Sequence, residues 1–211
     1  MSLVWGFWLS LWLHQAPADP EARLEEFVRR WEGLPAAAGR FEQVFRAPGA
    51  SERTRISGRF FVSGERFRIE AGEQLFVGDG QAIWIYDRRA RRALVLDYGS
   101  GSDLDWSVPA LLRGRWRDRF RVREYAVASS PEGKPALRFR LEARTPGTSP
   151  AELWLWVERA SGLPVRLELR DPAGEPVQIR LWAWQLDLAL GPDRFRFVPP
   201  PGTELLDRRR R

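Results

Sequence analysis

Hydrophobic and polar residues alternate with a period of two along most of this chain, from Arg40 to about residue 188. This period is typical of strands that bury one face, because successive side chains point to opposite sides of a strand. Clusters of Gly, Pro, Asp and Ser separate the alternating runs and predict tight turns. The pattern predicts strands at 40–46, 53–62, 66–70, 74–78, 82–87, 92–97, 119–127, 136–143, 152–158, 164–170 and 176–188.

Two segments depart from this period and are predicted to be helical. The first begins at Asp19 and Pro20, which favour a helix start, and ends near Gly33. Its apolar residues recur at the spacing of one helix face, and they are Leu24, Phe27, Val28 and Trp31. The second is a short apolar stretch at 107–114, inserted between two strands.

The predicted strands lack the long intervening helices that a parallel sheet requires, so an antiparallel sheet is expected. In the segments 83–86 and 153–157, aliphatic residues fall on one face and aromatic residues on the other. Both faces of these strands must therefore be covered. Two covers remain open at this point: a second sheet or helices in a filled core, or a lipid held in a cavity beneath the helices.

The first residues are typical of an export signal. An apolar run at 3–13 is shorter than the 20 or so residues of a membrane span, and Ala16-Pro17-Ala18 matches a cleavage pattern. We predict a signal peptide at 1–18 and a single mature domain at 19–211. No Lys or Arg precedes Leu3, which leaves an uncleaved interfacial anchor as the alternative.

The composition excludes most catalytic and metal chemistry. The chain has no Cys and one His, and that residue, His14, is lost with the leader. Thiol nucleophiles, Ser-His-Asp triads and the usual zinc sites are therefore excluded from the mature chain. Asp103 and Asp105 lie in a Gly/Ser loop and are better explained as turn residues than as an acid pair. We expect no catalytic residue, no metal and no cofactor, and hence a protein that is not an enzyme.

The formal net charge is +6, and of the 34 basic residues only Lys134 is a lysine. This bias is more typical of a GC-rich genome than of a phosphate-binding face. The arginine clusters at 88–92 and 113–119 lie in predicted turns or alternate with acidic residues. We therefore expect no nucleic-acid partner, and a membrane complex or anionic headgroups fit the charge better.

Several short motifs follow one another in a fixed order. They are GRFEQ at 39–43, GRFFV at 58–62, ERFRIE at 65–70, GDGQAIWIYD at 78–87, the short helix with Pro109, and FRFVPPPGTE at 195–204. Their order and spacing resemble the LolA-like family of periplasmic outer-membrane lipoprotein carriers, over residues 19–207. One departure is the family's Arg-Pro, which would fall at Ser63-Gly64 here. Arg66 and Arg68 are candidates for the gating role of that arginine.

The resemblance implies a mainly β (α+β) fold, an unclosed and strongly curved antiparallel barrel of about eleven strands, with two helices over an apolar cavity. It implies a periplasmic carrier, or chaperone, that shields the acyl chains of acylated lipoproteins. Its partners would be an inner-membrane ABC transporter complex and an outer-membrane lipoprotein acceptor. Free transit favours a monomer. The alternative is a periplasmic sensor of lipid or lipoprotein that uses the same half-barrel.

The residues predicted to line the cavity come from the strands and the short helix. They are Phe60, Val62, Phe67, Ile69, Ile83, Ile85, Val108, Leu111 and Leu112. A register slip of one residue would exchange the two faces of any strand. An ordinary core role and a ligand contact are equally open for each.

Overall fold

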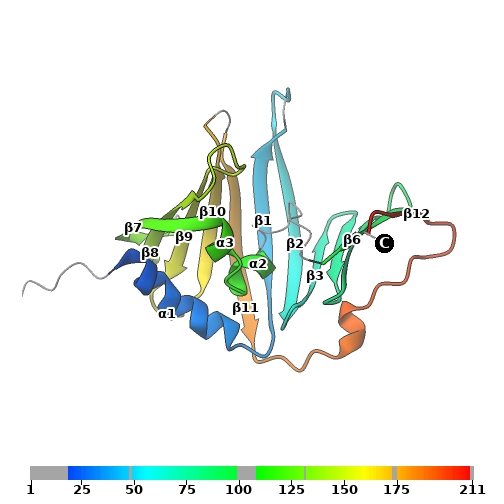
Figure 1. Ribbon diagram of the computed structural model, residues 1–211, viewed down its shortest axis with the longest axis horizontal. Helices are drawn as coiled ribbons and strands as arrows, with labels where there is room; N and C mark the ends of the chain where they lie inside the picture. Colours follow the sequence, from blue (N-terminus) through cyan, green and yellow to red (C-terminus); the bar gives the residue numbers. More distant parts are fainter. Residues whose placement is uncertain (1–18, 48, 99–107, 131, 173–174, 210–211) are drawn as a thin grey trace, which may run out of the picture.

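Twelve strands form one open sheet, and three helices lie against one of its faces (Figure 1). The computed structural model describes residues 19–209 apart from 48, 99–107, 131 and 173–174, and it leaves the side chains of Val108 and Pro109 undescribed. No helix in this part of the chain is long and apolar enough to cross a membrane.

The strands run in the order β12-β6-β5-β4-β3-β2-β1-β11-β10-β9-β8-β7, so β12 and β7 are the two edges and the sheet does not close. Strand β1 pairs with both β2 and β11, which joins a β2–β6 half to a β7–β11 half. The strands are β1 (Ala37–Arg46), β2 (Arg53–Ser63), β3 (Arg66–Ala71), β4 (Gln74–Gly78), β5 (Ala82–Asp87), β6 (Arg92–Asp97), β7 (Phe120–Ser129), β8 (Pro135–Ala143), β9 (Glu152–Glu158), β10 (Pro164–Arg170), β11 (Val177–Leu186) and β12 (Glu204–Asp207).

Helix α1 (Pro20–Glu32) forms where the sequence predicts it. The Asp19 carboxylate accepts a hydrogen bond from the backbone N–H of Glu21 at 3.1 Å, which satisfies one donor of the first turn. The apolar stripe is buried as expected and consists of Leu24, Phe27, Val28 and Trp31. At the end of the helix, Trp31 Nε1 donates to the carbonyl oxygen of Gly162 at 2.8 Å, which fixes α1 against the loop after β9.

The sheet face that packs against the helices, here called the inner face, carries the main hydrophobic core. Figure 1 shows α1, α2 (Val108–Leu112) and α3 (Trp116–Arg119) grouped beside the β7–β11 half and β1. Phe139, Leu141, Leu155 and Leu167 from this half are fully buried beneath them. Burying a side chain of this size stabilises the fold by about 1.5–3 kcal/mol.

The opposite, outer face of the β2–β6 half is covered by the C-terminal segment, which Figure 1 shows in orange and red. The 3-10 helix η1 (Pro192–Phe195) buries Phe195 to 1% exposure, and Phe197 lies 5.6 Å from the ring of Trp84 and 5.3 Å from that of Tyr86. Phe197, Trp84 and Tyr86 form a second, smaller core with their apolar neighbours on β4 and β6. The aromatic side of β5 is therefore covered by the chain itself.

The prediction of a mainly β, unclosed, curved sheet with an N-terminal helix is confirmed, and all eleven predicted strands are present within three residues of their predicted ends. Three details differ from the prediction. Residues after the proline run form a twelfth strand, and β12 pairs with β6 in parallel, so the sheet is not wholly antiparallel. The expected helix at 107–114 is α2 followed by a second turn, α3. The predicted leader at 1–18, Asp103 and Asp105 lie outside the described residues.

Candidate functional site

Six side chains predicted to line a cavity lie on one face of neighbouring strands. The register places Phe60 opposite Ile69 and Val62 opposite Phe67, and it continues through β4 to two residues of β5. Direct cross-strand neighbours share a face, so all six belong to the inner face. They are Phe60, Val62, Phe67, Ile69, Ile83 and Ile85.

Burial divides these six residues into two groups. The buried group has exposures from 1% to 5%, and it consists of Phe60, Val62, Phe67 and Ile83. Their side chains contribute to the packed interior. Ile69 and Ile85 are half-buried, so contact with a ligand stays a prediction for them.

Half-buried apolar side chains continue across the inner face from β3 to β6. The register places Phe76 between Ile69 and Ile85, and it places Leu94 opposite Ile85. With the next inward residue of β6 they make a patch here called the open apolar surface, which consists of Ile69, Phe76, Ile85, Leu94 and Leu96. None of these side chains ionises or donates a hydrogen bond. The patch can bind a ligand only by apolar contact.

Two glycines let aromatic rings lie flat on the inner face beside this surface. A Cβ on Gly78 would stand 2.3 Å from Cε1 of Phe67, and a Cβ on Gly39 would stand 2.6 Å from Cζ of Phe60. Only glycine permits so close an approach between a ring and the neighbouring strand. The rings therefore cover the backbone without rising far above the sheet.

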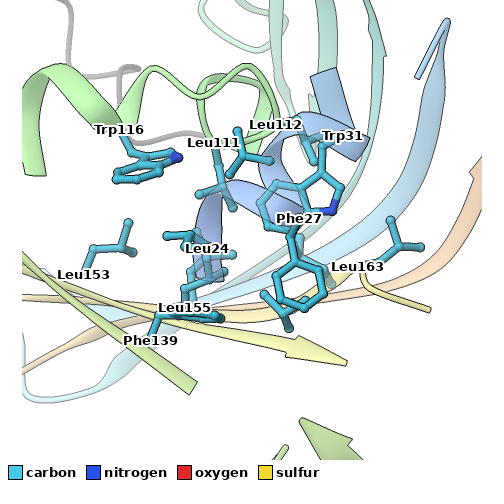
Figure 2. Packing of buried hydrophobic residues seen from close by; sticks show 14 of the residues in the cluster. Leu24, Phe27, Trp31, Leu111, Leu112, Trp116, Phe139, Leu153, Leu155 and Leu163 are labelled. Atoms are coloured by element: carbon cyan, nitrogen blue, oxygen red, sulfur yellow. The ribbon is translucent and has the colours of Figure 1, made fainter. Parts of the chain in front are cut away.

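The segment Val108–Arg119, here called the lid segment, contains α2 and α3 and packs on α1. Leu111, Leu112 and Trp116 are 1%, 2% and 2% exposed. Figure 2 shows these side chains facing those of α1 and the residues of β8 and β9 beneath them. Leu111 and Leu112 thus belong to the main core in this structure, and the side chain of Val108 lies outside the described part of the chain.

Arginine side chains hold the lid segment to α1. Arg117 donates to both carboxylate oxygens of Glu25, at 2.7 and 2.6 Å, and to Glu32 Oε1 at 2.7 Å. Hydrogen bonds to these two carboxylates raise the pKa of Arg117 above its ordinary value, so the guanidinium stays charged. The contact with Glu25 is bidentate, which is the stronger and more directional form of such a pair.

Arg113 adds a weaker contact at the same place. Its Nη1 donates to the backbone carbonyl of Glu32 at 3.0 Å, while its Nε is buried without a hydrogen-bond partner among the described residues. Burial lowers the pKa of Arg113, against the opposing effect of nearby Glu65 and Glu32. An unsatisfied buried donor costs about 1–3 kcal/mol, so the burial of Arg113 weakens the attachment of the lid segment to α1.

The lid segment is also tied to the turn between β2 and β3, at the edge of the open apolar surface. Arg115 forms an ion pair of 2.8 Å with Glu65 and stacks 4.9 Å from the ring centre of Tyr98. The Tyr98 hydroxyl donates to the carbonyl oxygen of Glu65 at 2.5 Å. Burial, and then the charge of Glu65, raise the pKa of Tyr98 to about 12. This tyrosine stays protonated and can keep its donor role at neutral pH.

Arg66 and Arg68, the predicted gating candidates, lie on the outer face. Arg66 stacks 5.3 Å from the ring centre of Phe195, and Arg68 pairs with Glu70 at 2.8 Å. They alternate with the inward-facing Phe67, so the pleat of β3 directs them away from the lid segment. A gating role for Arg66 and Arg68 stays a prediction. In this structure the arginines that contact α1 or Glu65 from the lid segment are Arg113, Arg115 and Arg117.

The sequence analysis missed these three arginines and part of the open apolar surface. Phe76, Leu94 and Leu96 were predictable from the sequence. Short turns connect β3 to β4, β5 and β6, so the inward residues of β3 determine which residues of the next strands face inward. For the arginines the available signal was the spacing of Glu25 and Glu32, which places two carboxylates on one side of α1. No sequence feature indicated that the segment at 113–117 lies beside them.

Many of the described carboxylates form ion pairs with arginine, and others accept backbone hydrogen bonds at caps and turns. No group of three or more His, Cys, Asp or Glu residues in the described ranges could hold a metal ion. A hydrogen bond from Arg140 lowers the pKa of Glu152. Burial raises the pKa of Glu70, but hydrogen bonds from Arg68 and Arg59 hold it below its ordinary value. Such acids are poor proton donors at neutral pH.

Comparison with known proteins agrees with this geometry. Residues 32–198 match the model of the outer membrane lipoprotein carrier protein LolA family. The chain belongs to the LolA family. A relative in this family, the outer-membrane lipoprotein carrier protein of Alkalilimnicola ehrlichii, is 29% identical over 203 residues, which cover 94% of this chain and 90% of that protein.

A solved structure has the same fold at low sequence identity. An uncharacterised conserved protein from Thermus thermophilus is 13% identical and superposes with a TM-score of 0.59, over 90% of this chain and all of that one. The open sheet of this LolA-family chain is therefore shared with a protein of very different sequence.

Proposed function

We propose that this protein binds the acyl chains of lipoproteins on the open apolar surface and carries them through the periplasm as a monomer. The observation that supports the proposal is a run of half-buried apolar side chains, from Ile69 on β3 to Leu96 on β6, at the edge of a lid segment that polar contacts hold in place. Membership of the LolA family supports lipoprotein as the cargo.

The apolar surface is sufficient for useful affinity. Each buried methylene contributes about 0.8 kcal/mol, so ten methylenes of one acyl chain contribute about 8 kcal/mol. Association and ordering cost about 4–15 kcal/mol. One acyl chain exceeds that cost only in the lower part of this range, and two such chains, at about 16 kcal/mol, exceed all of it. Binding then needs no polar group on the inner face.

Delivery requires differences in affinity along the route. The cargo would come from an inner-membrane ABC transporter complex and pass to an outer-membrane lipoprotein acceptor that binds it more favourably. Opening of the lid segment would expose the apolar surface to the next partner. No catalytic step belongs to this cycle, so the chain acts as a binding protein and not as an enzyme.

The test is native mass spectrometry of the chain recovered from a periplasmic fraction and mixed with a synthetic triacylated lipopeptide. We expect the wild-type protein to retain one lipopeptide. Phe76→Glu and Ile85→Glu place a charge on the open apolar surface at positions that face each other across β4 and β5, and both should abolish retention.

The matched control is Leu205→Glu, which introduces the same charge at a side chain that is 49% exposed on the edge strand β12. It should retain lipopeptide as the wild-type protein does. A wild-type protein that binds no lipopeptide, or inner-face variants that bind as well as the control, would contradict the proposal.

A further inference from the structure

Arginines lie on tryptophan rings across the outer face of the β7–β11 half. Arg138 and Arg170 lie 4.5 and 5.1 Å from the ring centre of Trp154, and Arg180 lies 4.5 Å from that of Trp182. Arg166 lies 5.8 Å from the ring centre of Trp156. Arg40 on β1 lies opposite Trp182 on β11. These arginines and tryptophans together are here called the arginine–tryptophan face.

The register of this face places like charges side by side. Arg166 is the direct cross-strand neighbour of Arg180, and Arg40 is the direct neighbour of Arg59. Like charges directly opposite one another destabilise a sheet. An anion between the partners relieves this repulsion. Glu168 pairs with Arg166 and Glu70 pairs with Arg59, each at 2.8 Å, so within the described part of the chain only one arginine of each pair has a carboxylate.

Elsewhere the chain supplies that anion itself. Arg46 and Arg53 are also cross-strand neighbours, and Glu175 bridges them with contacts of 3.0 and 2.9 Å. Arg180 and Arg40 form no ion pair with any carboxylate in the described ranges, although both are exposed. Glu42 is the cross-strand neighbour of Arg180 but pairs with Arg55 at 2.6 Å, so it does not bridge the arginines as Glu175 does.

One carboxylate does hold part of the face in position. Glu168 is 8% exposed and contacts Arg166 at 2.8 Å and Arg170 at 2.6 Å. Burial alone would raise the pKa of Glu168, but hydrogen bonds from Arg170 and Arg166 lower it below its ordinary value. This fixed charge orients two guanidinium groups and leaves Arg138, Arg180 and Arg40 to an external anion.

We propose that the arginine–tryptophan face docks the protein on an anionic lipid bilayer, with lipid phosphates between the arginines that face each other. Guanidinium groups bind phosphate through charge-assisted hydrogen bonds, and tryptophan rings favour the headgroup level of a bilayer. The inference uses the face opposite to the open apolar surface and does not depend on acyl-chain binding.

The test is co-sedimentation of the lipid-free chain with vesicles of phosphatidylethanolamine and phosphatidylglycerol, compared with vesicles of phosphatidylcholine. Binding should require the anionic lipid and weaken as salt is raised towards about 1 M, where screening acts within about 3 Å. The triple change of Arg40, Arg138 and Arg180 to Gln should weaken binding by about fivefold for each charge removed. The triple change of the same three arginines to Lys keeps the charges and should weaken vesicle binding less.

The matched control removes three exposed arginines outside this face, Arg89, Arg159 and Arg208, and changes the net charge equally. It should bind vesicles within about twofold of the wild type, because surface charge acts only within about a Debye length of the bilayer. Equal loss in both triple variants would overturn the inference, as would wild-type binding that ignores lipid charge. Loss of vesicle binding in Ile85→Glu alone would contradict the inference and assign docking to the inner face. Tighter binding to polyglutamate than to vesicles would also contradict it, and would assign the arginine–tryptophan face to an acidic protein.

Discussion

The β7–β11 half and the β2–β6 half of the sheet are built from similar alternating strands, yet opposite faces of the two halves are filled. In the first, α1 and the lid segment bury the inner face, and the outer face carries arginines on tryptophans. In the second, the C-terminal segment covers the outer face and the inner face keeps half-buried apolar side chains. Half-buried apolar side chains therefore lie beside the packed core and do not extend throughout the inner face.

The largest expected effect is on the free energy of unfolding, when a phenylalanine on the inner face of each half is replaced. Phe139 is fully buried under α1, whereas Phe76 is half-buried. We expect Phe139→Ala to lower the free energy of unfolding by about 3–5 kcal/mol, since it leaves a cavity in a packed core, and Phe76→Ala by about 1–2 kcal/mol. Urea denaturation measures both. Equal losses would mean that the two halves are packed alike and that the comparison is wrong.

The two outer faces should differ in their response to pH. The lowered pKa of Glu168 means that its carboxylate stabilises the fold above about 4.5, its ordinary value, and that this contribution disappears as the pH falls through the folded-state pKa. We expect Glu168→Gln to cost about 2 kcal/mol at neutral pH, with the difference from wild type shrinking below pH 4.5.

Phe197→Ala is the contrasting variant on the outer face of the other half, where the cover is apolar. It should cost about 2 kcal/mol at every pH, because no proton is taken up when this contact is lost. Thermal unfolding across a pH series measures both variants. A stability cost of Glu168→Gln that does not change with pH would show that packing of Glu168, and not its charge, stabilises the outer face of the β7–β11 half.

The smallest expected effect concerns the lid segment that covers only one half. Arg117 and Glu25 are 34% and 25% exposed, so their pair contributes no more than about 1 kcal/mol. Arg117→Gln should change stability by less than about 1 kcal/mol and speed the exchange of a bound fluorescent lipopeptide by up to about fivefold, the rate equivalent of that energy. Arg121→Gln, an exposed arginine of the adjoining strand, is the control. An unchanged exchange rate in Arg117→Gln would mean that the Arg117–Glu25 contact does not control release of the lipopeptide.

Most of the sheet could be predicted from local pattern, because alternation and turn residues specify each strand independently of the others. The inward phase of Phe67 and Ile69 was also predictable, and it already implied that Arg66 and Arg68 point the other way.

The remaining features depend on contacts between distant segments. The proline run at 199–201 argues locally against a strand, yet β12 forms just after it because β6 offers an unpaired edge. The aromatic faces of β5 and β9 required a cover, but Trp84 is covered by Phe197 and Trp154 by arginines, and no local signal distinguishes these outcomes. The lid contacts of Arg115 and Arg117 likewise join residues far apart in the chain.

The pairing of β1 with β11 has a consequence for how the chain reaches this structure. Ala37 is opposite Leu186, so the strand in the middle of the sheet pairs with a strand that is synthesised much later. Until then one edge of β1 is open to strands of other chains, and folds dominated by such distant pairings form slowly, in about milliseconds to seconds. We expect the yield of refolding to fall as protein concentration rises, and dilution to recover it.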